Sequence, residues 1–220
     1  MPPSRYAHDQ RIVEVADVKD LMRQMDSRGY TVREMYFKHN GSMEIGPWLP
    51  GRNYRGKDIA GYFDCESEFK LLVKLHKIVP DNIVRPLALV RFNGKSIGYT
   101  MEYVDGLTIG DYSDRPTTTK LNALEVLAKL YDIVELLHEN FSAHGDPNQR
   151  NIIVSGERLV LIDPLLHLDS SGFAGDSGLS KAMRNDAKVM RNVRDIIELM
   201  HGIHKGELEL YRRVRSQRRI

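Results

Sequence analysis

The sequence predicts an α+β fold with two lobes, the first rich in β-strands and the second mainly helical. β-Branched and aromatic runs separated by turn residues dominate the first half, whereas the longest runs with helical periodicity lie in the second half. A chain of 220 residues can bury a core and form one large domain or two small lobes. We therefore expect one functional domain in which residues 1–104 form the N-lobe and residues 105–220 form the C-lobe.

The amino-acid composition excludes several kinds of protein and site. The 32 basic and 30 acidic residues give a net charge of +2, so the surface as a whole is not built to bind a polyanion. The single cysteine, Cys65, excludes an intramolecular disulfide and a metal site made of cysteines. No segment is apolar and long enough to span a membrane, and the first residues lack the apolar region of a signal peptide. We expect a cytoplasmic protein.

The first elements alternate between strand and helix. Arg11–Val15 is a candidate strand, and Asp17–Arg28 has apolar residues at helical spacing before Gly29, where a helix would end. Thr31–His39 is β-branched and aromatic enough to form a further strand, with Lys38 near its end.

Residues 40–64 are expected to form a long ordered loop, because glycine, proline and aromatic residues are frequent there. Within it, Gly51–Lys57 has the spacing of a phosphate-binding P-loop. However, Asp58 stands where the magnesium-binding hydroxyl residue should be, and no buried strand precedes the motif. We interpret this spacing as coincidental.

A helix and a hairpin complete the predicted N-lobe. Glu66–Ile78 has a helical apolar face and ends before Pro80. Two apolar runs, residues 83–90 and 97–104, flank the turn dipeptide Asn93-Gly94 and are typical of a hairpin.

The second half contains the longest periodic segments. Lys120–Phe141 is predicted to be a core helix, and a final helix should span roughly Lys181–His204. Leu165–Leu179, rich in Ser, Gly and Asp, is expected to be a surface loop. The last ten residues, Tyr211–Ile220, are expected to be a solvated charged tail, with a nucleic-acid or acidic partner as the alternative. This tail contains five arginines: Arg212, Arg213, Arg215, Arg218 and Arg219.

Between these two helices, a predicted hairpin carries polar residues at its open end. Residues 152–154 and 159–162 are β-rich and flank a short turn. Asn151 and Asp163 therefore lie at the same end of the hairpin, where their oxygen atoms can bind one Mg²⁺. Asp146 lies nearby and can accept or orient the proton of an attacking hydroxyl group.

Three segments resemble the protein-kinase-like superfamily from about Thr31 onward. YTMEYVDG, Tyr99–Gly106, is similar to the segment that connects the two kinase lobes and receives adenine. HGDPNQRN, His144–Asn151, resembles the catalytic-loop pattern HxDxxxxN, and LIDP, which contains Asp163, stands where DFG usually does. The variants HGD and IDP are similar to small atypical kinases and aminoglycoside-phosphotransferase-like kinases.

The resemblance implies a nucleotide site. Met101 would lie at the back of the adenine pocket, and the backbone of Glu102, Tyr103 and Val104 would contact adenine.

The N-lobe resembles the kinase subunit of the KEOPS tRNA-modification complex and the Kdo/lipopolysaccharide kinases. The likeness consists of Lys38, a long insert and then Glu68. It implies that Lys38 binds the α- and β-phosphates of ATP and that Glu68 holds Lys38 in an ion pair. Lys57 is the rival for the phosphate-binding lysine.

The sequence also departs from the kinase pattern. Arg11–Gly29 is read as strand and helix, so no glycine-rich loop precedes Lys38. Asn148 stands two positions after Asp146, where protein kinases often have lysine, and Arg150 could supply the missing positive charge.

Two further residues have alternative roles. His144 is implied by the resemblance to brace the catalytic loop. Asp186 either caps the last helix or binds the backbone of the catalytic loop, and the sequence does not separate these alternatives.

The predicted function is ATP- and Mg²⁺-dependent phosphoryl transfer to the hydroxyl group of a protein or a small molecule. A pseudokinase that binds without catalysis is the first alternative, motivated by the missing glycine loop. An ATPase subunit that serves a tRNA-processing partner is the second.

Overall fold

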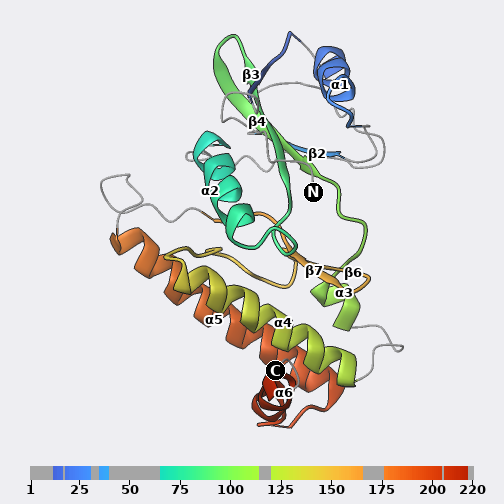
Figure 1. The fold of residues 1–220 in the computed structure, drawn as a ribbon, viewed down its shortest axis with the longest axis vertical. Helices are drawn as coiled ribbons and strands as arrows, with labels where there is room; N and C mark the ends of the chain where they lie inside the picture. Colours follow the sequence, from blue (N-terminus) through green and yellow to red (C-terminus); the bar gives the residue numbers. More distant parts are fainter. Residues whose placement is uncertain are drawn as a thin grey trace. The chain divides into compact units, whose positions relative to one another are not determined.

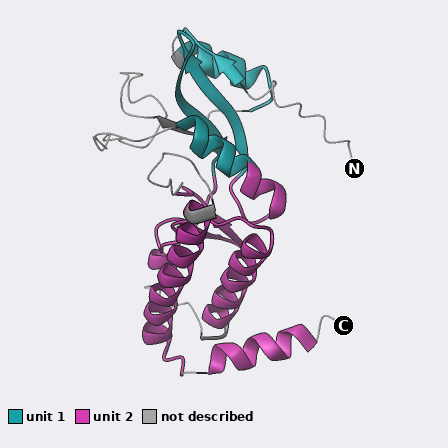
Figure 2. Ribbon diagram, turned by 90° about the vertical axis from the view of Figure 1, so that its left-hand side faces the viewer, with its two compact units in different colours: residues 1–73, 85–103 teal, residues 74–84, 104–220 magenta. Residues whose placement is uncertain are grey.

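The computed structural model describes residues 12–16, 18–30, 35–39, 65–113, 120–165, 176–204 and 206–217. The chain divides into two compact units, one of residues 1–73 and 85–103 and the other of residues 74–84 and 104–220 (Figure 2). Unit 1 contains the larger sheet and unit 2 contains the long helices. The α+β class predicted from the sequence is confirmed, because strands dominate unit 1 and helices dominate unit 2.

Unit 1 is built on a four-stranded sheet in the order β1-β3-β4-β2 (Figure 1). The strands are β1 (Ile12–Glu14), β2 (Met35–His39), β3 (Pro86–Phe92) and β4 (Lys95–Glu102). β3 and β4 form the predicted hairpin, and β2 pairs antiparallel with β4. β1 pairs parallel with β3, which the sequence did not indicate.

Helix α1 (Val18–Asp26) follows β1 and packs on this sheet. Leu21 and Met25 of α1 are buried against apolar side chains of the strands. The strand and the helix predicted before Gly29 are thus confirmed. The other buried residues of this core are Val13, Val15, Leu87, Ala88, Val90 and Ile97.

Helix α2 (Cys65–Ile78) has the predicted apolar face. Its first nine residues, 65–73, belong to unit 1 and its remaining residues belong to unit 2. Within unit 1, Leu72 is fully buried, and the ring of Phe69 lies 5.8 Å from the ring of Tyr99 in β4. The apolar face of α2 therefore packs on the side of β4 that carries Tyr99.

Unit 2 contains a three-stranded sheet in the order β5-β6-β7. The predicted hairpin is formed by β6 (Ile152–Ser155) and β7 (Arg158–Leu161), and β5 (Leu107–Thr108) pairs with β6. Gly106 precedes β5 and lies against the backbone of β6, because a Cβ at this position would lie 3.0 Å from the carbonyl carbon of Val154. Glycine is required where two backbones approach this closely.

Four helices complete unit 2: α3 (Ile109–Ser113), α4 (Lys120–Glu139), α5 (Asp176–His201) and α6 (Glu207–Gln217). α4 and α5 run side by side (Figures 1 and 2). Their buried residues recur every three or four positions, as expected of packed amphipathic helices. Among them are Leu127, Leu130, Val134, Leu137, Met190, Val193 and Ile197.

Two expectations about the second half were wrong. Helix α5 begins at Asp176, so residues 176–179 are helical and do not belong to a surface loop. Residues 207–217 form α6, so most of the predicted tail is ordered. The physical reason is ion pairing with α4: Arg215 binds Asp132 at 3.0 Å, and Arg212 binds Glu135 at 2.5 Å.

Several predictions fall outside the described residues. They are the P-loop-like segment Gly51–Lys57 with the rival lysine Lys57, the first residues of the strand predicted from Thr31, and the end of the arginine tail. Among the described residues, no helix is long and apolar enough to span a membrane.

Candidate active site

Asp186 anchors the loop that carries the HGD motif. It lies within α5 and is completely buried. Its Oδ1 accepts the backbone N–H of Gly145 at 2.7 Å, and its Oδ2 accepts the backbone N–H of His144 at 3.0 Å. Oδ2 also lies 3.0 Å from Nε2 of His138 in α4. Of the two roles that the sequence left open, Asp186 therefore binds the loop backbone and does not cap the helix.

The backbone N–H and the carbonyl oxygen of Gly145 are both hydrogen-bonded to side chains of α5. Its N–H donates to Asp186, and its carbonyl oxygen accepts the side-chain amide of Asn185. Its φ of 85° lies in the left-handed region, which glycine adopts without strain. The loop therefore has one backbone conformation at this point, set by two neighbouring residues of α5.

His144 braces the loop through its backbone. Its N–H binds Asp186, and its carbonyl oxygen accepts the N–H of Leu165 at 2.9 Å. The imidazole is fully buried, and neither ring nitrogen has a hydrogen-bond partner of normal geometry among the described residues. Burial lowers the pKa of His144, and the charges of Asp186, Asp146 and Asp163 and the backbone of Ile162 oppose this shift. The ring is therefore uncharged at pH 7 and packs in the core.

Two asparagines hold the candidate base, Asp146. Asn148 Nδ2 donates to Asp146 Oδ2 at 2.8 Å, and Asn151 Nδ2 lies 3.3 Å from the same oxygen. Asn151 Nδ2 also donates to the backbone oxygen of Asp146 at 3.0 Å. The side chain of Asp146 is only partly buried, so it can reach a ligand from this fixed position.

Asp163 lies next to Asn151 at the open end of the hairpin. The N–H of Ile162 donates to the backbone oxygen of Asn151 at 2.9 Å, which extends the β6–β7 pairing by one residue. Asp163 then adopts a φ of 54°, in the left-handed region that aspartate and asparagine enter more readily than most residues. The sequence prediction that Asn151 and Asp163 occupy one end of the hairpin agrees with this register.

These residues fit a magnesium ion in their chemistry. The amide nitrogen of Asn151 faces two oxygens of Asp146, so its amide oxygen is directed elsewhere and can bind a cation. Asp163 adds a carboxylate. Mg²⁺ is typically bound by one or two such protein oxygens together with water and phosphate oxygens. No cluster of three or more His, Cys, Asp or Glu residues suited to a metal occurs in the described parts of the chain.

The candidate phosphate-binding residues belong to unit 1. Lys38 in β2 lies directly opposite Tyr99 in β4. The Tyr99 hydroxyl donates to Glu68 Oε1 at 2.6 Å, and Glu68 is only 7% exposed. Residues opposite one another in an antiparallel pair share a face of the sheet. The register therefore assigns position 38 to the face on which Tyr99 meets Glu68, whereas the side chain of Lys38 lies outside the described part of the structure.

Sequence reasoning missed Tyr99 as a partner of Glu68. The only signal was its position in the apolar run before the predicted lobe connection, where tyrosine is ordinary. Its role depends on the pairing of β2, β4 and α2, which are distant in sequence.

The predicted adenine-binding residues lie at the end of β4. Met101 is buried, whereas Tyr103 is 40% exposed. The N–H of Glu102 donates to the backbone oxygen of Arg85 at 2.9 Å, and Glu102 Oε1 accepts the N–H of Arg85 at 3.2 Å. The backbone N–H of Glu102 is thus already paired within unit 1, and the chain passes into unit 2 at Val104.

Arg150 lies in the loop between Asn148 and Asn151. Its backbone N–H donates to Asn148 Oδ1 at 2.8 Å. Its side chain is exposed and forms no ion pair with a described residue. It is therefore available as the positive charge that the sequence suggested.

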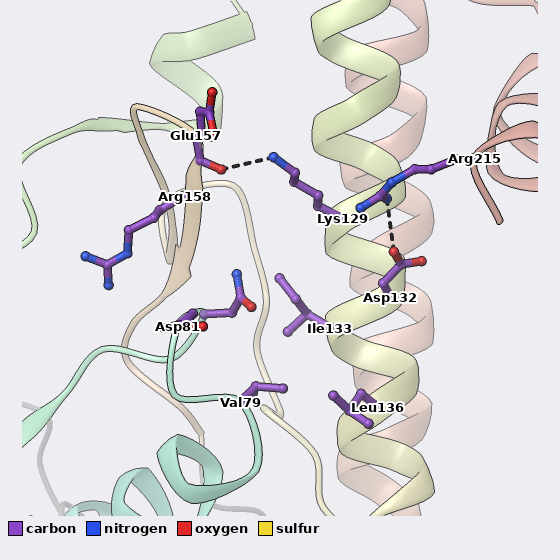
Figure 3. A pocket seen from close by; sticks show the side chains of 10 residues that line it. Val79, Asp81, Lys129, Asp132, Ile133, Leu136, Glu157, Arg158 and Arg215 are labelled. Carbon is purple, nitrogen blue, oxygen red and sulfur yellow. Dashed lines mark hydrogen bonds and ion pairs between the residues drawn. The ribbon is translucent and has the colours of Figure 1, made fainter. Parts of the chain in front are cut away.

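A separate pocket of about 480 Å³ lies at the turn end of the β6–β7 hairpin, opposite the end that carries Asn151 (Figure 3). Lys129 Nζ binds the backbone oxygen of Glu157 at 3.0 Å, and Arg215 binds Asp132. Further acidic and basic side chains, among them Asp81 and Arg158, also line this pocket. Its apolar wall is formed by Val79, Ile133 and Leu136.

Comparison with known proteins finds one weak similarity to a protein kinase among the curated sequences. The chain has weak sequence similarity to the probable serine/threonine-protein kinase YbdM of Bacillus subtilis, with 29% identity over 100 residues. The match covers 44% of this chain and only 38% of that relative. No family model matches the chain.

Among solved structures, a mutant of the PknI kinase domain of Mycobacterium tuberculosis has a TM-score of 0.42 and 16% identity. The alignment covers 60% of this chain and 56% of that one. A likeness of this size does not by itself identify a fold or a function.

Proposed function

We propose that the chain transfers the γ-phosphoryl group of ATP to a hydroxyl acceptor in a Mg²⁺-dependent reaction. The observation that carries this proposal is the arrangement in unit 2, where buried Asp186 fixes the loop that presents Asp146 beside Asn151 and Asp163. The sequence similarity to a serine/threonine kinase supports the same class of reaction. These contacts support the proposal, because they hold Asp146 against Asn151 at the hairpin end where Asp163 follows β7.

In the proposed reaction, Asp146 orients the acceptor hydroxyl and accepts its proton. The hydroxyl oxygen forms a bond to the γ-phosphorus, the bond from the γ-phosphorus to the bridging oxygen breaks, and the electron pair leaves with ADP. Asn151 and Asp163 would hold Mg²⁺, which supplies neutralisation of the phosphate charge when it is bound.

Unit 1 is proposed to bind the nucleotide. Lys38 would contact the α- and β-phosphates, and Glu68 would orient Lys38 through an ion pair. The support is the position of Lys38 on the sheet face where Glu68 is buried with Tyr99. Arg150, which is exposed beside the loop, would contribute positive charge near the transferred group.

The proposed acceptor is a hydroxyl-bearing protein or small molecule in the cytoplasm. Of the tail arginines that the structure describes, Arg213 would contact an acidic or nucleic-acid partner, because Arg212 and Arg215 are paired with α4. Binding of a labelled RNA oligonucleotide that is unchanged in Arg213→Ala would contradict a role of Arg213 in RNA binding.

The alternative of a pseudokinase is favoured by one observation in unit 1. β1 and α1 occupy residues 12–26, before β2, where kinases have a glycine-rich phosphate loop. A pseudokinase would bind ATP but would not release or transfer its γ-phosphate.

The proposal is tested by measuring phosphate release and phosphoryl transfer from ATP by the full chain. Asp146→Asn should lower kcat by about 10²- to 10⁴-fold, because the proton acceptor is lost while the loop contacts remain. Asp195→Asn, at a residue of α5 whose side chain is 66% exposed, is the matched control and should retain full turnover. Nucleotide binding without any turnover in the unmodified chain would favour the pseudokinase, and undiminished turnover in Asp146→Asn would contradict the assigned base.

A further inference from the structure

Both the nitrogen and the oxygen of the Asn148 side-chain amide form hydrogen bonds. Its Nδ2 donates to Asp146 Oδ2 at 2.8 Å, and its Oδ1 accepts the backbone N–H of Arg150 at 2.8 Å. Its backbone is also paired, because its N–H donates to the Asp146 carbonyl at 2.8 Å and its carbonyl accepts the N–H of Asn151 at 2.9 Å. The residue therefore closes the turn and contacts the candidate base at the same time.

The orientation of this amide follows from its two partners. The Arg150 backbone N–H is a donor and requires the amide oxygen, whereas the Asp146 carboxylate is an acceptor and requires the amide nitrogen. The flipped amide would place oxygen against oxygen and N–H against N–H. The backbone N–H of Arg150 thus directs the Asn148 donor to Asp146.

Both asparagine donors reach the same carboxylate oxygen of Asp146. Oδ2 accepts from Asn148 at 2.8 Å and lies 3.3 Å from the donor of Asn151. The carboxylate is thereby prevented from rotating, and Oδ1 is the oxygen left to face an acceptor hydroxyl. Of the two donors, Asn148 makes the shorter contact and has no proposed role in metal binding.

We infer that Asn148 is a positioning residue for phosphoryl transfer, which fixes the Asp146 carboxylate so that Oδ1 takes the proton of the acceptor hydroxyl. This inference rests on the proposed function. The O–H bond of the acceptor breaks, the proton binds Asp146 Oδ1, and the acceptor oxygen forms its bond to phosphorus as ADP leaves. A neutral amide thereby orients the base itself, at a position where protein kinases often have a lysine.

The test compares two substitutions that separate the role in the turn from the role at Asp146. Asn148→Asp keeps an oxygen that can accept the N–H of Arg150 but removes the donor to Asp146. Asn148→Ala removes both contacts. The matched control is Asn93→Asp, the same exchange at an exposed turn residue between β3 and β4. For each full-length variant, kcat, the KM for ATP and the thermal midpoint are measured.

The inference predicts that Asn148→Asp lowers kcat by about 10- to 100-fold with little change in the KM for ATP, as expected when a reacting group is misplaced. The thermal midpoint of Asn148→Asp should stay closer to that of the unmodified chain than the midpoint of Asn148→Ala does, and Asn93→Asp should have normal kinetics. Normal kcat in Asn148→Asp with reduced kcat in Asn148→Ala would mean that only the turn matters, and the inference would be wrong. Absence of turnover in the unmodified chain would overturn the proposed function as well.

Discussion

The carboxylate of Asp186 in α5 accepts the backbone N–H of Gly145 at 2.7 Å, although the two residues are separated by 41 positions in the sequence. This contact joins a core helix to the loop that carries Asp146. Since Asp186 is completely buried, the hydrogen bonds that it accepts from the loop offset the cost of removing its carboxylate from water. The conformation of the candidate active site and the stability of unit 2 are therefore coupled at this residue.

Replacing Asp186 by alanine should destabilise the chain by about 3 kcal/mol, because two buried backbone N–H groups lose their acceptor. Urea unfolding followed by circular dichroism measures the change. Asp195→Ala, on the exposed side of the same helix, should change the free energy of unfolding by less than about 0.5 kcal/mol. A loss below about 1 kcal/mol in Asp186→Ala would show that the loop is not held by this carboxylate.

Burial of His144 predicts a loss of stability in mild acid. Its pKa is lowered in the folded chain from the ordinary value of 6.5, so the unfolded chain takes up the proton first as the pH falls. The contribution of a neutral His144 is thus fully present above pH 6.5 and is lost as the pH falls from 6.5 toward the lower folded pKa, with a slope of at most about 1.4 kcal/mol per pH unit.

Urea unfolding between pH 5 and pH 7.5 tests this prediction. The dependence on pH should be weaker in His144→Gln than in the unmodified chain. His204→Gln is the control, since His204 is exposed. An equal pH dependence in all three proteins would mean that the imidazole of His144 is not responsible.

Much of the fold could be predicted from the sequence because its signals are local. The β6–β7 hairpin follows from two apolar runs about the turn at Gly156, and α4 follows from apolar residues at helical spacing. Asn151 and Asp163 were placed together because a hairpin fixes the register of its own ends. This part of the candidate site therefore needed no information from distant segments.

Other features could not be predicted because they depend on contacts between distant segments. The two roles left open for Asp186 differ only in whether α5 packs beside the loop at Gly145. The sequence predicts a solvated charged tail where α6 forms. The partners of Arg212, Asp132 and Glu135, lie about 80 positions earlier in the chain, so the local sequence does not indicate them. No local pattern reports such long-range pairing.

Gly106→Ala should destabilise the chain by roughly 1 to 3 kcal/mol, because the new methyl group would collide with the backbone of Val154. The matched control is Gly110→Ala, four residues later, where the nearest atoms to a new Cβ lie 3.8 Å away. This control should be neutral or slightly stabilising, since alanine favours the helix more than glycine does. Equal effects of the two substitutions on the urea midpoint would refute the close approach of β5 and β6.

The ion pair between Arg215 and Asp132 should contribute about 0.5 kcal/mol to the docking of α6, a typical value for a partly exposed pair. A double-mutant cycle with Arg215→Ala and Asp132→Ala measures this coupling energy. The coupling should decrease at high salt because exposed charges are screened. Arg213→Ala, at an exposed residue of the same helix, should leave stability unchanged. A coupling of zero at low salt would contradict the pairing.

The central claim, that Asn151 and Asp163 hold Mg²⁺ for a reaction with ATP, is tested most directly by thermal unfolding of the full chain with ATP, with and without Mg²⁺. Asp163→Asn is the informative variant, because asparagine tolerates the left-handed backbone at this position but removes the charge. At saturating MgATP, the account predicts that the midpoint of the unmodified chain rises by about 5 to 10 °C and that most of this rise is lost without Mg²⁺ or in Asp163→Asn. An equal rise in Asp163→Asn, or no rise in the unmodified chain, would contradict it.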